Sequence, residues 1–355
     1  MPQQRTNPLP ERIAPLDELV NVLEVEEVAR RRLDRAVFDH VAAGAGGGDT
    51  LRRNREAFDR ITLRPRMLVD VTQMDLSTEL FGQKLYAPLL VAPTARHARL
   101  HPEGEPATTA GAGAAKTAMV VSGEASFPIE KIAARAAAPL WFQVYPESDS
   151  SRLRAAIQRA TGAGCRVVVL TVGAVYEPPR EADLHNRFSR DAPRPGGPLR
   201  PRGQTRMGWD VLQQVRDLAK VPVLLKGILS AEEASLAVEK GAAGIIVSNH
   251  GGRFADGVPA TIEVLPRVVE AVGRRVPVLV DSGFRRGTDI LKALALGARA
   301  VLVGRPVLWG LAAYGAEGVR AVLEMLQSEL ALAMGLSGKA NLAAVDSSLV
   351  KIHRW

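Results

Sequence analysis

Eight short apolar runs, each followed by a segment of helical character, constrain the fold of this chain of 355 residues more than any other feature. The runs are rich in Val, Leu and Ile and do not alternate with polar residues, which is typical of strands buried on both faces of a parallel sheet. Eight such units predict an α/β fold, a closed (β/α)8 TIM barrel rather than an open doubly wound sheet. The runs cover residues 86–93, 117–123, 140–145, 166–172, 221–227, 243–249, 276–283 and 299–306.

The segments between the runs fit helices. Ser230 is a predicted N-cap, because Glu233 follows three residues later and Gly241 stands just past the end of the helical pattern. We expect a single domain over residues 1–355, in which an N-terminal helical extension of about 80 residues packs on the barrel.

The connection between the fourth and fifth runs is the longest in the chain, and it is rich in proline. A loop of this length in a compact domain is usually functional or disordered. We therefore expect residues 174–207 to form a mobile lid over the mouth of the barrel.

Composition narrows the class of partner. The 46 basic and 38 acidic residues leave a net charge of +8, and the basic residues are scattered over many predicted helices. We interpret their one local concentration as a solvated loop and expect no nucleic-acid partner. It consists of Arg190, Arg194, Arg200, Arg202 and Arg206.

Three absences bear on location. The sequence holds no apolar run of about 18 residues, so we expect no membrane anchor, and its polar N-terminus lacks the core of a secretory signal. The one cysteine, Cys165, cannot form an internal disulfide, which favours a reducing, cytoplasmic setting. It opens an apolar run, so we interpret it as a core residue. We expect no metal site.

Polar residues gather where the runs end. In a (β/α)8 barrel the active site lies at the carboxyl ends of the strands, so these side chains are expected to meet there. In chain order they are Thr94, Ser122, Gln143, Tyr145, Thr171, Lys226, Asn249, His250, Asp281, Gly304 and Arg305.

The last two runs lead into a predicted phosphate site. Gly283 and Gly304 would let backbone N–H groups approach phosphate oxygens, while Arg285 and Arg305 would supply charge and paired donors. Gly283 with Arg285, or Gly304 with Arg305, would alone be interpreted as a surface arginine beside a turn glycine. Both pairs on the two strands that commonly hold phosphate in barrels predict a phosphate-bearing ligand.

The motifs SNHGGRFADG, DSGFRRGTD, LLKGI, VAPTA, HPEGE, FQVY and READLHNRF together resemble the FMN-dependent α-hydroxy-acid oxidases, a family that includes glycolate oxidase, lactate oxidase and mandelate dehydrogenase. The resemblance covers roughly residues 15–340. It implies FMN as cofactor, a small carboxylate substrate, dioxygen or another electron acceptor, and a homotetramer.

The resemblance also implies residues that hold the cofactor. Lys226 would stabilise the negative charge of the reduced flavin, because a fixed cation beside it raises its potential. The other residues that would contact FMN are Pro93, Thr94, Ala95, Ser122, Gln143, Thr171, Ser248, Asp281, Gly283, Arg285, Gly304 and Arg305.

For the chemistry, the resemblance assigns His250 as the base, and a histidine titrates near neutrality, as that role requires. It places Arg253 and Arg180 on the substrate carboxylate and Tyr145 on the substrate oxygen. On its own, His250 would be read as a structural histidine; its setting in SNHGGR reverses that reading.

Three positions depart from the family. Gly173 stands where the family usually has an aspartate that pairs with the catalytic histidine, and His40 replaces a tyrosine near the substrate carboxylate. Glu124 follows the second run, where the family has an aromatic or small residue. All three lie where substrate should sit, which indicates altered chemistry or substrate.

Two roles for these replacements stay open at this point. Glu124 should repel a small anion and could recognise an amine or hydroxyl group, and Glu124 or His40 could replace the missing aspartate. The plainer interpretation is that Glu124 points to solvent and that His40 caps its helix.

Two other functions compete with oxidation of an α-hydroxy acid. One is a non-redox FMN isomerase of the type II isopentenyl diphosphate isomerase kind, whose diphosphate substrate would suit a basic lid. The other is a catalytically altered flavin-binding protein, which the loss of the aspartate motivates. The joint presence of His250, Arg253, Tyr145 and Lys226 favours the oxidoreductase over both.

Overall fold

The computed structural model describes residues 13–147, 149–174, 176–188, 197 and 208–353. Eight parallel strands close into a barrel in the order β10-β11-β4-β5-β6-β7-β8-β9, which confirms the predicted (β/α)8 architecture. Each of the eight predicted runs overlaps a strand that is shorter than the run, and only β8 extends past the end of its run, by one residue. The strands are β4 (Leu89–Val91), β5 (Ala118–Ser122), β6 (Leu140–Val144), β7 (Val168–Thr171), β8 (Val223–Ile228), β9 (Gly244–Val247), β10 (Val278–Val280) and β11 (Ala300–Val303).

Alternate residues of each barrel strand face opposite sides, as the pleat of a strand requires. One set fills the interior of the barrel, for example Val120, Trp141 and Leu224. The other set packs outward against the surrounding helices, for example Leu89 and Met119. Because both sets are apolar, the sequence shows continuous apolar runs rather than alternation.

Helices follow the strands around the barrel. Ser230 caps α9 as predicted, since its Oγ accepts a hydrogen bond from the backbone N–H of Glu233. The helices that follow β4 through β11 are α4 (Gly104–Ala114), α5 (Ile129–Ala133), α6 (Ser150–Gly162), α7 (Glu181–His185), α8 (Asp210–Ala219), α9 (Ala231–Glu239), α10 (Thr261–Val272), α11 (Gly287–Ala295) and α12 (Arg305–Leu336), with the 3-10 turns η2 (His97–Arg99), η3 (His250–Gly252), η4 (Leu342–Ala344) and η5 (Ser347–Leu349).

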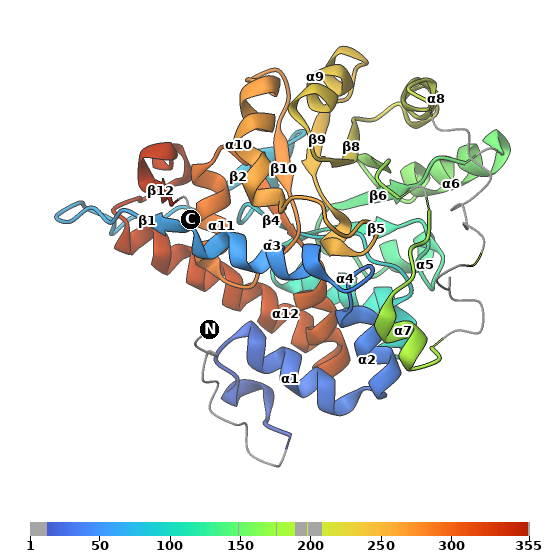
Figure 1. The fold of residues 1–355 in the computed structure, drawn as a ribbon, viewed down its shortest axis with the longest axis horizontal. Coiled ribbons are helices and arrows are strands. Elements are labelled where there is room, and N and C mark those ends of the chain that lie inside the picture. Colours follow the sequence, from blue (N-terminus) through green and yellow to red (C-terminus); the bar gives the residue numbers. More distant parts are fainter. Residues whose placement is uncertain (1–12, 148, 175, 189–196, 198–207, 354–355) are drawn as a thin grey trace.

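The N-terminal extension begins with η1 (Leu16–Glu18), followed by α1 (Val22–Arg32), α2 (Arg35–Ala42) and α3 (Asp49–Asp59). The chain breaks between α1 and α2, where Asp34 caps α2 by accepting hydrogen bonds from the N–H groups of Ala36 and Val37. Figure 1 shows α1 lying along α12 and α2 lying beside α7.

Beyond α3 the extension is not helical. The strand β1 (Ile61–Leu63) pairs with β12 (Val350–Ile352), so a segment before the barrel joins one after it (Figure 1). The hairpin of β2 (Thr78–Leu80) and β3 (Gln83–Leu85) packs Leu80 and Leu85 against the barrel interior. Helical periodicity could not predict these strands, because the partner of β1 lies at the other end of the chain.

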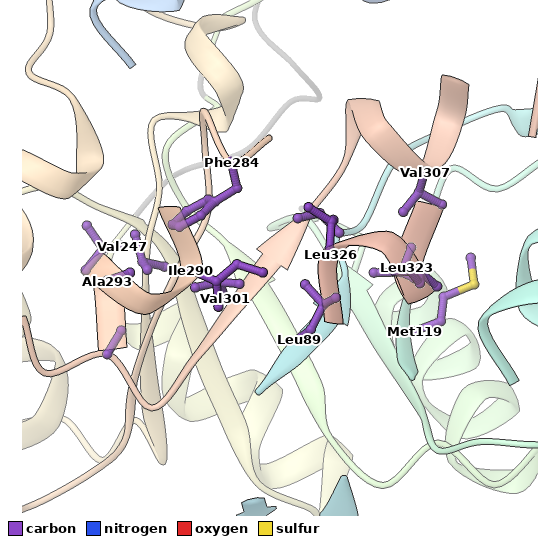
Figure 2. Packing of buried hydrophobic residues seen from close by; sticks show 14 of the residues in the cluster. Leu89, Met119, Val247, Phe284, Ile290, Ala293, Val301, Val307, Leu323 and Leu326 are labelled. Atoms are coloured by element: carbon purple, nitrogen blue, oxygen red, sulfur yellow. The ribbon is translucent and has the colours of Figure 1, made fainter. Parts of the chain in front are cut away.

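The core joins the outer face of the barrel to the helices. Figure 2 shows Leu323 and Leu326 of α12 facing Met119 of β5 and Leu89 of β4. Cys165 is 1% exposed and belongs to this core, as predicted. Burial raises the pKa of its thiol to about 12, so the thiol is protonated at neutral pH.

The long connection after β7 is anchored at its start. Its helix α7 packs on α2, and the backbone N–H of Gly46 donates to the carbonyl of Pro179 at 3.0 Å. The predicted lid continues through residues 189–196 and 198–207, which lie outside the described residues together with all five arginines of the predicted basic loop.

Candidate functional site

A cavity of about 590 Å³ opens at the carboxyl ends of the barrel strands. It brings together most of the residues that the sequence predicted for the site. Those that line it are His40, Pro93, Thr94, Ala95, Ser122, Glu124, Tyr145, Arg180, Lys226, His250, Arg253, Asp281, Gly283, Arg285, Gly304 and Arg305. Four residues expected at this face do not line the cavity but are buried at or next to the strand ends: Gln143, Thr171, Ser248 and Asn249.

The strand pleat explains this convergence. On each strand, the residue two positions after an interior side chain belongs to the predicted site. Ser122 follows Val120 in this way, and Lys226 follows Leu224. Side chains on the interior side of each strand are therefore apolar and packed within the barrel, and they belong to the predicted site at the carboxyl end of the strand. The same step leads to Thr94, Gln143, Thr171, Ser248, Asp281 and Gly304.

Lys226 is the cation at the base of the cavity. Its side chain is 2% exposed, and its Nζ lies 3.1 Å from Oδ2 of Asp281. Nζ also donates to Oγ of Ser248 at 2.9 Å. A buried ammonium held by a carboxylate and a hydroxyl is fixed in position, so it can act on a developing negative charge without reorganisation.

Two buried polar atoms beneath the cavity have no protein partner. Among the described residues, Nε2 of Gln143 and Oγ1 of Thr171 form no hydrogen bond, although each side chain is 1% exposed. Oε1 of Gln143 accepts from Oγ of Ser122 at 3.1 Å, which leaves its amide N–H₂ as a donor. Unsatisfied donors and acceptors of this kind fit the polar edge of an isoalloxazine ring.

Two arginines line one part of the cavity, Arg285 after β10 and Arg305 at the start of α12. The Arg285 side chain is 11% exposed, and its nearest ion-pair contact is Glu26 at 3.9 Å. Burial, together with the charge of Arg285, lowers the pKa of Arg305 to about 9. The charges of both guanidinium groups would attract an anion here, and the N-terminus of α12 lies beside Arg305. The flavin's phosphate fits this part of the cavity.

Gly283 has a packing role besides its place in the phosphate loop. It adopts φ of +90°, and a Cβ at this position would stand 2.3 Å from the backbone oxygen of Asn54 in α3. The Asn54 side chain in turn exchanges hydrogen bonds with that of Asn249, at 2.9 and 2.7 Å. These contacts seat the N-terminal extension on the loops that bear the site.

The carboxyl end of α2 is held by two site arginines. Nη1 of Arg253 donates to the carbonyls of His40, Val41 and Ala43, at 2.8, 3.1 and 3.0 Å. Arg305 donates to Val41 and Ala43 as well, through Nε at 2.8 Å and Nη2 at 2.9 Å. Cations at a helix C-terminus stabilise it, so this end of α2 forms a fixed wall of the cavity.

The backbone of His250, the predicted base, has an unusual conformation. Its φ is +59°, and the glycines on its carboxyl side, Gly251 and Gly252, also have positive φ. Its backbone N–H donates to Oγ of Ser248 at 3.0 Å, and its ring meets Phe254 edge to face at 4.4 Å. Left-handed backbone at a non-glycine residue is common at functional sites, and here it aims the imidazole at the cavity.

His40 does more than cap its helix. Its Nδ1 lies 2.9 Å from Oδ1 of Asp183, and its ring stacks on Phe188 with centroids 4.2 Å apart. Arg180 also contacts Asp183 through Nη1 at 3.3 Å, and its Nε has no hydrogen-bond partner among the described residues. The cavity wall therefore holds a His40–Asp183–Arg180 cluster.

The structure also shows the surroundings of the other two positions that depart from the family, Glu124 and Gly173. Glu124 is half-buried and lines the cavity, so it does not simply point to solvent. Gly173 packs against Gly227, and a Cβ at Gly173 would stand 3.3 Å from the Gly227 backbone. A side chain at position 173 would therefore press on the strand that carries Lys226.

Sequence reasoning missed several residues of the site. Asp183 and Phe188 belong to the READLHNRF motif, which was the available signal, but nothing in that motif indicated contact with His40. His97, in the loop after the first run, was assigned no role from the sequence. It is fully buried and bonds Oγ1 of Thr94 through Nε2 at 2.6 Å and Oγ1 of Thr108 through Nδ1 at 2.8 Å.

The described residues contain no cluster of three or more His, Cys, Asp or Glu side chains that could hold a metal ion. Within the same part of the chain, the helices are too short or too polar to cross a membrane.

Comparisons with known proteins agree with this site. Residues 29–352 match the family model of the FMN-dependent dehydrogenases. The chain is 42% identical to an L-lactate oxidase of Nostoc sp., over 94% of this chain and 98% of the relative. It is 42% identical to a glycolate oxidase of Spinacia oleracea, over 93% and 95%. The crystal structure of a mandelate oxidase with (S)-2-phenylpropionate superposes with a TM-score of 0.88 at 40% identity, over 95% of this chain and 100% of that chain. This chain therefore belongs to the family of FMN-dependent dehydrogenases, with FMN as its cofactor.

Proposed function

We propose that this protein is an oxidoreductase that uses FMN to oxidise an α-hydroxy acid to the corresponding 2-oxo acid. The observation that carries the proposal is the cavity at the strand ends, which joins a phosphate-binding end, orphaned polar atoms and His250 in one space. Relatives named lactate oxidase, glycolate oxidase and mandelate oxidase support the substrate class.

Particular residues would hold the cofactor. Arg285 and Arg305 would neutralise its phosphate, and the side chains of Gln143 and Thr171 would bond the ring with the atoms that lack a protein partner. Lys226 would stabilise negative charge on the ring. The bound flavin supplies a two-electron acceptor, which no side chain of this protein can replace.

His250 would act as the general base. Oxidation of an α-hydroxy acid removes two electrons and two hydrogens, and His250 takes one of these as a proton, from the hydroxyl group or the α-carbon. Its backbone is fixed by Ser248 and its ring by Phe254, so the imidazole approaches substrate with little freedom to lose.

The substrate carboxylate would bind at Arg180 and Arg253, with Tyr145 contacting the substrate oxygen. Nε of Arg180, which has no hydrogen-bond partner among the described residues, would be a buried cationic donor for that carboxylate. Both arginines are tied to protein groups on one side, which fixes their direction toward the cavity.

We also propose dioxygen or another acceptor for reoxidation of the flavin, a cytoplasmic location, and a homotetramer. The solitary Cys165, buried and reduced, suits a reducing compartment. Met67, Leu68 and Val69 form an exposed apolar stretch, which suits burial between subunits.

An anaerobic titration tests the function. The purified protein should show the visible bands of oxidised flavin, and a panel of small and bulky 2-hydroxy acids is added in the absence of oxygen. Bleaching by at least one compound, with formation of its 2-oxo acid in equal amount, is the expected result. Flavin that no member of the panel bleaches would contradict the proposal.

A further inference from the structure

The tautomer of His40 is fixed by its partner. Nδ1 lies 2.9 Å from Oδ1 and 3.0 Å from Oδ2 of Asp183. Burial alone would raise the pKa of Asp183, but hydrogen bonding from His40 and the charge of Arg180 more than offset it, so the pKa is lowered. An ionised carboxylate can only accept, so Nδ1 carries the hydrogen.

The other ring nitrogen is therefore an acceptor. Burial is the largest cause that lowers the pKa of His40; the hydrogen bond and charge of Asp183 act to raise it, but burial together with the charges of Arg253 and Arg180 outweighs them, so the ring is neutral near pH 7. A neutral imidazole has one N–H, and in His40 it is used at Nδ1. Within the described part of the chain Nε2 makes no hydrogen bond, while the ring lines the cavity and is 23% exposed.

The orientation of this acceptor is also restrained. The ring of His40 stacks on Phe188 with an interplanar angle of 10°, and the helix that bears it is held by Arg253 and Arg305. The stack keeps the ring in its plane, and a half-turn within that plane would break the contact of Nδ1 with Asp183.

The charges around His40 select the kind of donor that could meet it. Away from the phosphate end and the Lys226–Asp281 pair, four guanidinium groups and three carboxylates line the cavity: Arg96, Arg99, Arg180 and Arg253, and Glu124, Glu177 and Asp183. Arg180 and Arg253 would be paired with the substrate carboxylate, and Asp183 already contacts His40 and Arg180, so Arg96 and Arg99 stand against Glu124 and Glu177 in equal number. An ammonium group would therefore find no excess of anions to offset its loss of hydration, whereas a neutral donor loses less on burial.

We propose that His40 is a specificity-determining residue whose Nε2 accepts a hydrogen bond from a neutral donor of the substrate. The preferred substrate is then an α-hydroxy acid that carries a second hydroxyl group or an amide N–H. A carboxylate cannot be the partner of Nε2, because neither of the two has a hydrogen to share. The inference rests on the proposed function for the identity of the substrate class, but not for the geometry.

Equilibrium binding tests the inference without turnover. The FMN-loaded protein is titrated calorimetrically with phenylglyoxylate, with its 3-hydroxy and 4-hydroxy derivatives, with the matching methoxy and aminomethyl compounds, and with 4-hydroxy-2-oxobutyrate. At least one hydroxylated ligand should bind about three- to tenfold more tightly than its partner without the donor, the range expected for one hydrogen bond. His40→Phe, which keeps a ring against Phe188, should abolish that difference.

Three results would overturn the inference: no preference for a hydroxylated ligand, a preference that survives in His40→Phe, or tightest binding of an aminomethyl compound. Nitrogen NMR of the wild-type imidazole, assigned by its loss in His40→Phe, gives a second measurement. Nε2 should be unprotonated, and a proton on Nε2 would refute the tautomer on which the argument depends.

The outcomes separate this inference from the proposed function. Flavin that bleaches with hydroxy acids, in a protein without donor preference, removes the role of His40 and leaves the function standing. A clear donor preference in a protein whose flavin no hydroxy acid reduces removes the function and leaves the role of His40 standing.

Discussion

Nδ1 of His40 lies 2.9 Å from Oδ1 of Asp183, across a separation of 143 positions in the chain. The contact joins α2 of the N-terminal extension to α7 of the long connection after β7. Nearby, Asn186 donates to Asp39 at 2.7 Å between the same two helices. A helix that precedes the barrel and a helix from the connection between β7 and β8 thus form one wall of the cavity, and that wall carries a titratable ring.

Acid should destabilise the protein as the pH falls below 6.5. Burial lowers the pKa of His40 and of His97 from the ordinary value of 6.5. Unfolding restores the ordinary value, so between the lowered pKa and 6.5 the unfolded chain binds more protons. Stability is therefore full above that window and falls as the pH falls through it.

The pH dependence is measured by urea unfolding at about pH 8 and about pH 5.5. His40→Phe removes one of the two titrating rings, so this variant should lose less stability on acidification than the wild type. An equal loss in the two proteins would show that His40 titrates normally in the folded state.

Replacing Lys226 by Met should affect both stability and flavin chemistry. The substitution leaves Asp281 buried without its cation, which typically costs about 3–5 kcal/mol. It also removes the positive charge at the base of the cavity, so the reduction potential of bound FMN should become more negative, by about 30 mV for each 1.4 kcal/mol of lost stabilisation.

Lys84→Met is the matched control for this experiment, because Lys84 is exposed in β3. It should change neither the urea midpoint of the FMN-free protein nor the potential of the bound flavin. A Lys226→Met protein with an unchanged potential would remove Lys226 from its assigned role beside the flavin, whatever happened to stability.

Alanine at Gly283 should destabilise the protein more than alanine at another glycine with similar backbone. Gly283 has φ of +90°, and a Cβ there would stand 2.3 Å from the backbone oxygen of Asn54. Gly257 has φ of +79° with nothing within 4 Å of the same position. Gly257→Ala should cost about 1 kcal/mol from backbone strain alone.

Gly283→Ala adds a steric clash to that strain, so we expect a further loss of about 1–3 kcal/mol. Thermal unfolding of the two FMN-free variants gives the comparison directly. Equal melting temperatures would mean that α3 does not press on the loop after β10 as the structure describes.

The thiol of Cys165 should be inert in the folded protein. Burial raises its pKa to about 12, and the side chain is 1% exposed, so both thiolate formation and access are suppressed. A thiol-reactive disulfide reagent should release no chromophore from the native protein at mild alkaline pH and one equivalent after unfolding in urea. Rapid reaction before unfolding would place Cys165 outside the core.

The barrel could be predicted from sequence because its signal is local. A strand buried on both faces must be apolar along its length, so each of the eight strands can be recognised from its own apolar run. The site could be predicted for the same reason. A polar residue at the end of a run lies on the same side of its strand as the interior residue two positions earlier, as Ser122 does relative to Val120.

The contacts that sequence could not predict are those between distant segments. Nothing near Ile61 indicates that β1 pairs with β12, and nothing near His40 indicates Asp183. Gly283 was assigned to a phosphate loop, while its close approach to Asn54 depends on how α3 is seated. Such contacts are set by packing of the completed barrel rather than by any local pattern.

Single-turnover reduction of the flavin in His250→Asn tests the central claim, that this histidine at the end of β9 removes the substrate proton. The variant and the wild type are loaded with FMN to equal occupancy and mixed anaerobically with whichever hydroxy acid bleaches the wild type. The account predicts reduction slowed by about 10²–10⁴-fold, the usual contribution of a general base, with FMN affinity unchanged. Reduction at the wild-type rate would contradict it and would assign the proton transfer to another group.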